Sequence, residues 1–214
     1  MAVRADPEKS GDEYYIMMHG DPTWSIPDGN SMMDFSVRMY EDEDGLNEES
    51  KKRLDEALTF AAALDEKGHL HDGFTLCSDY CFNVNPFFNE EQFDEFIVPY
   101  LKEVIAEYRK MGYYTIKHTD GNILPILEML IAAGPHVLHS IDPVAGMSMR
   151  EVRKKADGRI ASGGQKNHWQ RYCPGRQCKL RTAADRNRRR MSCRCYACTA
   201  GRHGNRQRIC IRNL

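Results

Sequence analysis

The run Tyr113-Tyr-Thr-Ile-Lys-His118 is aromatic and β-branched, and the polar turn Thr119-Asp-Gly-Asn122 follows it directly. The run predicts a buried strand, and the turn marks the point where that strand ends. An apolar helical stripe precedes the run and stops at Gly112, and a second stripe begins at Ile123. A strand between two helices with short connections indicates a βαβ unit with parallel strands.

The same alternation extends through the chain on both sides of this unit. Predicted strands cover 14–18, 72–77, 113–118, 136–141 and 159–162. Predicted helices cover 47–66, 93–112 (with a second segment starting at Pro99), 123–131 and the residues after Ser148, which opens a capping-box pattern with Glu151. Strands that alternate with helices fit either a doubly wound sheet or a (β/α)8 barrel.

Polar clusters at 78–80, 118–122 and 142–143 each follow a predicted strand. In both folds this is the carboxyl edge of the sheet, where ligand-binding residues gather. No predicted strand is followed by a Gly-x-Gly-x-x-Gly or Gly-x-x-x-x-Gly-Lys-Ser/Thr pattern, which argues against a nucleotide-binding sheet. We therefore predict the α/β class, with a partial (β/α)8 TIM barrel of about five βα units.

The charge of the chain is divided along its length, although 30 Lys and Arg nearly balance 31 Asp and Glu. Residues 166–214 hold 14 Lys and Arg and one acid, a net charge of +13, whereas residues 1–165 carry −14. The segment after residue 165 has no Val or Phe and contains six of the eight cysteines. Because so few of its side chains can form a core, we predict a partial barrel over 1–165 and a disordered tail over 166–214.

Three explanations fit this Cys/Arg-rich tail. Its cysteines, including Cys193-x-Cys195-x2-Cys198, could ligate structural zinc, and Arg188-Arg-Arg190 could contact nucleic-acid phosphates. The third is out-of-frame translation, since Gln165-Lys-Asn167 can be encoded by an unbroken run of adenines, a typical slip site. We favour a frameshifted or disordered tail, and keep a zinc- or nucleic-acid-binding module as the alternative function of the chain.

No window of the sequence approaches the roughly 18 to 20 apolar residues that a membrane span requires. The N-terminal segment lacks the apolar region of a secretory signal, and the tail cysteines alone do not indicate secretion. We therefore expect no membrane partner.

Several motifs lie in order between residues 72 and 164, and they carry a family resemblance. They are Asp72-Gly followed by Ser78-Asp-Tyr80, Phe96-Ile-Val-Pro-Tyr-Leu-Lys102, Lys117-His-Thr-Asp-Gly-Asn122, Ser140-Ile-Asp-Pro-Val-Ala-Gly-Met147 and Arg150-Glu-Val-Arg-Lys154. Together they resemble the uroporphyrinogen decarboxylase (URO-D) superfamily, which also includes cobalamin- and coenzyme M-linked methyltransferases.

The resemblance implies a (β/α)8 barrel and a cytoplasmic enzyme of porphyrin metabolism or of corrinoid-linked methyl transfer. It covers about 90 residues, the middle of the family's barrel. The Arg-Gln-Ala-Gly-Arg-Tyr-like segment, with which true porphyrinogen decarboxylases hold substrate carboxylates, does not occur in the sequence. We therefore expect a decarboxylase-like (lyase) or methyltransferase-like chain that is incomplete and could be inactive.

The strand-end residues form the candidate site. His118 and Asp120 flank Thr119, so both side chains point the same way by the two-residue period of a strand. We assign Asp79, His118 and Asp120 to catalysis. The residues assigned to substrate binding are Tyr80, Asn122 and Asp142. Helix capping is the structural alternative for Asp79, Asp142 and Asn122.

The resemblance also implies a metal at His118. In the family's methyltransferases the position of His118 and Asp120 is His-x-Cys, which binds a zinc that activates a thiol. An imidazole and a carboxylate can still bind a borderline metal, and Cys77, Asp79 and Glu128 are candidates for a third ligand. Hydrogen bonding to a substrate and a local structural role are the alternatives.

The implied cofactors depend on the reaction. A decarboxylase-like enzyme needs none, whereas a methyltransferase-like enzyme implies zinc and a corrinoid. The expected partners are a small-molecule or tetrapyrrole substrate and a corrinoid protein. We expect no nucleic-acid partner.

Overall fold

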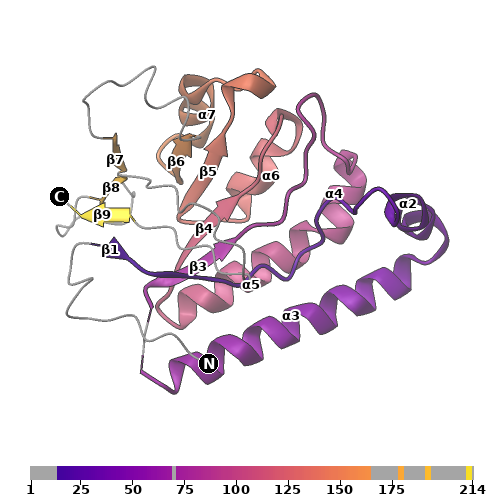
Figure 1. Cartoon of the computed structure of the whole chain (residues 1–214), viewed down its shortest axis with the longest axis horizontal. Helices are drawn as coiled ribbons and strands as arrows, with labels where there is room; N and C mark the ends of the chain where they lie inside the picture. The colour runs from indigo at the N-terminus through magenta and orange to yellow at the C-terminus, as the bar shows by residue number, and fades with distance from the viewer. Residues whose placement is uncertain (1–13, 69–70, 165–177, 181–190, 194–210, 214) are drawn as a thin grey trace.

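A sheet of five parallel strands, in the order β2-β3-β4-β5-β6, forms the centre of the structure (Figure 1). The computed structural model describes residues 14–68, 71–164, 178–180, 191–193 and 211–213. The strands of this sheet are β2 (Met17–His19), β3 (Gly73–Leu76), β4 (Tyr114–His118), β5 (Val137–Ile141) and β6 (Ala161–Gly164). Each overlaps a predicted strand, which confirms the parallel α/β class.

Helices connect the successive strands, as the alternating pattern predicts. They are α2 (Met32–Glu41), α3 (Glu43–Asp65), α4 (Glu90–Phe96), α5 (Val98–Lys110), the 3-10 turn η2 (Leu124–Ile126), α6 (Leu127–Ala132), the 3-10 turn η3 (Pro143–Ala145) and α7 (Met149–Ala156). Pro99 lies in the first turn of α5, where it removes no helical hydrogen bond. Ser148 caps α7 by accepting a hydrogen bond from the backbone N–H of Glu151.

Helix α2 was not predicted from the sequence, and α3 begins four residues before its predicted start at residue 47. Asp42 separates the two helices with a non-helical backbone, φ −143° and ψ 47°. The apolar side chains of α2 are divided between the core and solvent: Phe35 and Met39 are buried, whereas Met33 and Tyr40 are exposed. This division leaves a weak helical pattern in the sequence.

The strand order distinguishes between the two predicted architectures. Each strand is paired in parallel with the next strand along the chain, from β2 through to β6. A doubly wound sheet reverses its order at a switch point, whereas a (β/α)8 barrel adds every strand on the same side of the last. The described strands are therefore consistent with the predicted partial TIM-like fold.

Aromatic side chains fill the core between the sheet and its helices. Phe74 of β3 stacks on Tyr108 of α5, with ring centroids 4.0 Å apart, and contacts Tyr113 edge to face. Tyr108 also donates a hydrogen bond to the carbonyl oxygen of Gly20 at 2.9 Å, which fastens α5 to the loop after β2. This packing fixes the position of the loops that follow β2 and β3 relative to the sheet.

The predicted tail contributes three short strands to a second, antiparallel sheet in the order β1-β9-β8-β7. They are β7 (Cys178–Leu180), β8 (Met191–Cys193) and β9 (Ile211–Asn213), and β1 is Tyr14–Tyr15. Most of the tail lies outside the described residues, so its predicted disorder stays a prediction.

The other predictions for the tail fall mainly on residues outside the described ones. Four statements about the tail therefore stay predictions: the zinc module, the nucleic-acid arm, the frameshift and the domain boundary near Gly164. Within the part of the chain that the structure describes, no helix is both long and apolar enough to span a bilayer.

Candidate functional site

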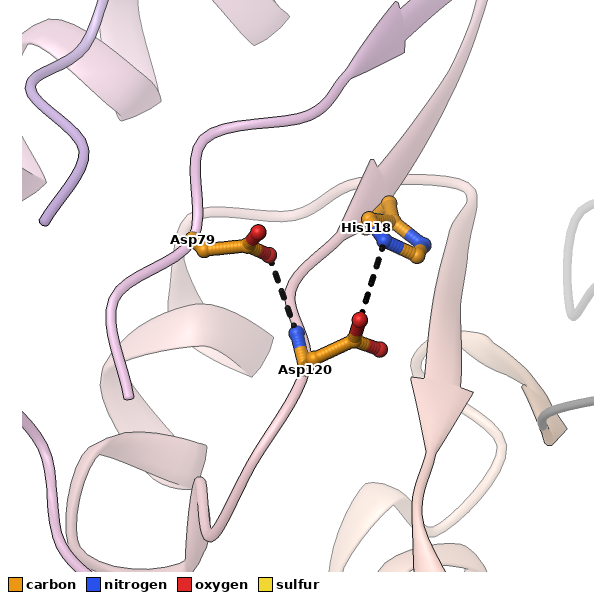
Figure 2. A group of neighbouring side chains, drawn as sticks. All are labelled: Asp79, His118 and Asp120. Atoms are coloured by element: carbon orange, nitrogen blue, oxygen red, sulfur yellow. Dashed lines mark hydrogen bonds and ion pairs between the residues drawn. The ribbon is translucent and has the colours of Figure 1, made fainter. Parts of the chain in front are cut away.

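The three residues assigned to catalysis meet at the carboxyl edge of the sheet (Figure 2). Asp79 follows β3, His118 is the last residue of β4, and Asp120 lies two residues further along. One ligand atom of each lies within 4.8 Å of the others. His118 Nε2 is 3.8 Å from Asp120 Oδ2, as the two-residue period predicts for side chains on one side of an extended segment. Their catalytic role stays a prediction.

Main-chain hydrogen bonds hold Asp79 at this position. Its Oδ1 accepts a hydrogen bond from the backbone N–H of Asp120 at 3.1 Å, which joins the loops after β3 and β4. Its own N–H donates to Ser25 Oγ at 3.0 Å, and its carbonyl oxygen accepts from Ile26 at 2.8 Å. The loop after β2 therefore fixes the backbone of Asp79 from the other side.

His139 of β5 lies beside His118, because the two residues are partners in the parallel pairing of β4 and β5. Their Nδ1 atoms are 2.9 Å apart, and their rings stack with centroids 5.1 Å apart. Two ring nitrogens at this distance share one proton, so one donates and the other accepts. Burial lowers the pKa of His118 and the adjacent His139 lowers it further, against the opposing effect of Asp120. A neutral imidazole is the form that binds metals.

Ser140 contacts the same cluster from the next position of β5. Its Oγ donates a short hydrogen bond to Asp120 Oδ1. The register between β5 and β6 shifts between Leu138 and Ile141, and Ser140 has a left-handed backbone with φ 73°. That conformation costs roughly 1–2 kcal/mol for a residue with a Cβ atom. The bulge at His139–Ser140 is therefore strained, and it lies at the site.

The structure contains a buried ion pair, between Lys117 and Asp21, that was not predicted from the sequence. Lys117 Nζ is 2.8 Å from Asp21 Oδ2, and both side chains are almost fully buried, with 0% and 1% exposure. Burial opposes the charged form of Asp21, but Lys117 and hydrogen bonds from Thr23 and Ser78 outweigh it and hold the pKa of Asp21 below its ordinary value. A lysine inside the apolar run 113–118 is the signal that indicates such a partner.

The residues assigned to substrate binding lie outside the three-residue cluster. Tyr80 is fully buried, its hydroxyl lies 2.6 Å from Thr23 Oγ1, and its ring lies 4.0 Å from Lys117 Nζ. Asp142 caps η3 by accepting a hydrogen bond from Val144 N–H at 2.9 Å, which confirms the capping alternative. A role of Tyr80 and Asp142 in binding substrate stays a prediction.

Asn122, the third residue assigned to substrate binding, holds the loop in which it lies. Its Nδ2 donates to the carbonyl oxygen of Val84 at 2.9 Å, and its Oδ1 accepts from Leu124 N–H at 3.2 Å. The second bond stabilises the start of η2, so Asn122 acts as a local cap. Its role toward a substrate also stays a prediction.

Of the candidate third ligands, Asp79 is the one that joins His118 and Asp120 among the described residues. Glu128 instead forms an exposed ion pair with Arg159 at 3.0 Å. Cys77 does not belong to this group of ligand atoms, and burial raises the pKa of its thiol.

The donor set fits a divalent cation. One imidazole and two carboxylates suit zinc and harder ions such as manganese, iron and cobalt. One atom of each ligand is held by a hydrogen bond: His118 Nδ1 by His139, Asp120 Oδ1 by Ser140, and Asp79 Oδ1 by a backbone N–H. Ligands of protein metal sites are oriented in this way.

The fold and this edge define a class: an α/β chain with a parallel sheet and polar residues at its carboxyl edge. Comparison of the sequence with protein-family models and with curated proteins gave no match. A solved structure with a similar fold is a methyltransferase from Methanosarcina mazei, with a TM-score of 0.52 and 17% sequence identity. The match covers 62% of this chain and 36% of that chain. The chain therefore shares its fold with part of a methyltransferase.

Proposed function

We propose that this chain is part of a methyltransferase-like enzyme in which Asp79, His118 and Asp120 bind a divalent metal ion. The observation that carries the proposal is the meeting of three ligand atoms within 4.8 Å at the carboxyl edge of a parallel sheet. That edge is where barrels of this type place their chemistry. The fold shared with a methyltransferase supports the same class.

The residues of the site suit the activation of a small thiol substrate. When bound, the metal ion supplies Lewis acidity that lowers the pKa of a coordinated thiol. Nδ1 of His118 is hydrogen-bonded to His139 Nδ1, which leaves Nε2 of His118 to face the site. The carboxylates of Asp79 and Asp120 balance the two positive charges of a divalent cation.

The proposed reaction moves a methyl group from a corrinoid on a partner protein to this thiol. The thiol proton leaves to solvent, and a bond forms between the sulfur and the methyl carbon. The bond between the methyl carbon and its donor breaks, and its electron pair stays on the donor. The chain orients the sulfur, because His118 and Asp120 approach the site from one strand end and Asp79 from the neighbouring one.

The identity of the metal follows from Asp120. The methyltransferases that the sequence resembles have cysteine at this position, and a thiolate favours soft ions. A carboxylate in place of the thiolate still binds zinc, and it also suits cobalt and manganese. We propose zinc as the resident ion, with cobalt as a spectroscopic substitute.

Metal titration of the purified chain tests the proposal. We expect one zinc or cobalt ion per chain, and binding at least tenfold weaker in His118→Ala and Asp79→Asn. His19→Ala is the matched control, since His19 is an exposed histidine at the end of β2. Wild-type protein that binds no metal, or a His118→Ala variant that binds it equally well, would overturn the metal site.

A transfer assay tests the reaction itself. Methylcobalamin and 2-mercaptoethanesulfonate are the probes, with loss of the methyl–cobalt absorbance and formation of the thioether as readouts. We expect turnover that requires the metal and is lost in His118→Ala. Tetrapyrrole decarboxylation and a binding role of the tail stay sequence-based predictions.

A further inference from the structure

We infer that the β-bulge at His139–Ser140 positions the side chains of His118 and Asp120 so that they can bind a metal ion. The inference rests on the proposed metal site and assigns positioning roles to two residues that the predicted site does not contain. Both residues act through the ligands that they contact.

The first observation is the direction of the two side chains. In a regular strand, consecutive side chains point to opposite faces, so neighbouring residues cannot both reach one cluster. Here His139 contacts His118 through Nδ1 at 2.9 Å, and Ser140 contacts Asp120 through Oγ. The register shift between Leu138 and Ile141 is what allows both contacts.

The second observation is the residue type at the strained position. Ser140 has φ 73°, a conformation that glycine adopts without cost. A glycine would form the same bulge but would have no hydroxyl to hold Asp120. The side chain of Ser140 is buried, and Asp120 is its hydrogen-bond partner.

The third observation is what these bonds do to the ligand atoms. The hydrogen bond between His118 Nδ1 and His139 Nδ1 fixes the imidazole ring of His118 with Nε2 toward Asp120. The bond from Ser140 holds Asp120 Oδ1, and Asp120 Oδ2 then lies 3.8 Å from His118 Nε2. One bulge therefore sets the relative position of two ligand atoms that come from β4 and the loop after it.

Four variants of the full chain test this inference. Ser140→Gly keeps the backbone conformation and removes the hydroxyl. His139→Phe keeps an aromatic ring beside His118 and removes the acceptor, whereas His139→Asn places an amide oxygen near the position of Nδ1. Ser162→Ala is the matched control, since Ser162 is a buried serine on β6 whose Oγ contacts the sulfur of Met149.

The first measurement is cobalt affinity, followed by visible absorption. We expect the dissociation constant to rise about tenfold or more in Ser140→Gly and His139→Phe. We expect His139→Asn and Ser162→Ala to stay within about threefold of wild type, because both retain the contacts to the ligands. Unchanged affinity in Ser140→Gly and His139→Phe would overturn the inference while leaving the metal site intact.

The second measurement needs no metal. Long-range ¹H–¹⁵N NMR spectra of the metal-free protein report which nitrogen of His118 carries the proton. We expect Nδ1 in wild type and His139→Asn, and a mixture of both nitrogens in His139→Phe. If wild type binds no cobalt but shows this pattern, the positioning role stands and the metal site fails. If the proton position is the same in all variants, the positioning role fails.

Discussion

Lys117 and Asp21 form a buried ion pair that holds both main-chain groups of the residue before Asp79. Their charged atoms lie 2.8 Å apart, although the residues are 96 positions apart in the chain. Asp21 Oδ2 accepts a hydrogen bond from Ser78 N–H at 2.8 Å, and Lys117 Nζ donates to Ser78 O at 2.8 Å. The ion pair thus fixes the loop that carries one proposed ligand.

Removal of the lysine charge should destabilise the protein strongly. Lys117→Met leaves Asp21 buried without its cation, and we expect a loss of about 3–5 kcal/mol in the free energy of unfolding. Urea denaturation measures the loss.

Lys110→Met, at an exposed pair with Glu107, should change stability by no more than about 1 kcal/mol. Adding Asp21→Asn to Lys117→Met should recover much of the loss. A loss near that of Lys110→Met would contradict the role of the pair.

His136 predicts a pH dependence of stability at the opposite end of β5. Its Nδ1 accepts a hydrogen bond from Thr115 N–H at 3.0 Å. Burial, assisted by Arg109, lowers the pKa of His136 from 6.5 to about 4. The unfolded chain binds this proton more tightly than the native chain. The contribution of His136 is therefore fully present above pH 6.5 and is lost as the pH falls toward 4.

The expected loss from His136 between pH 7 and pH 4 is about 2 kcal/mol, after allowance for its partial exposure. His136→Asn keeps an acceptor for Thr115 N–H but does not titrate in this range. Urea denaturation at several pH values should show a smaller acid loss in His136→Asn than in wild type. Parallel pH profiles for the two proteins would show that protonation of His136 does not oppose folding.

Gly121 should tolerate no side chain, since two constraints act on it. Its φ is +85°, and a Cβ atom would lie against the carbonyl oxygens of Cys81 and Phe82. We expect Gly121→Ala to cost about 2–4 kcal/mol. Gly134→Ala is the control, because Gly134 has φ +77° but nothing within 4 Å of such a Cβ atom. It should cost about 1–2 kcal/mol. Equal losses in thermal or urea denaturation would show that the backbone contact is unimportant.

Asp142 should act on stability rather than on metal binding. It caps η3 through Val144 N–H, so Asp142→Ala should cost about 0.5–2 kcal/mol in the free energy of unfolding. We expect its cobalt affinity to equal that of wild type. Asp142→Asn keeps an oxygen acceptor and should retain most of the stability. Weaker cobalt binding in Asp142→Asn would place Asp142 in the site.

The sequence predicts the strands well because their signal is local. The run that ends at His118 is strand β4, and the polar residues after it lie at the carboxyl edge of the sheet, as expected for parallel strands. The same local reasoning places His118 and Asp120 on one side. It misses α2, because the break at Asp42 and the exposed side chains of that helix weaken its pattern.

The sequence by itself determined the alternation of strands and helices and the edge at which polar residues collect, since apolar periodicity and glycine stops act within a few residues. Only the tertiary structure decided what completes the site. His139 and Ser140 reach it through a bulge that breaks strand periodicity, and Asp21 meets Lys117 from 96 residues away. Such contacts depend on the pairing of distant strands, and no local pattern of residues encodes that pairing.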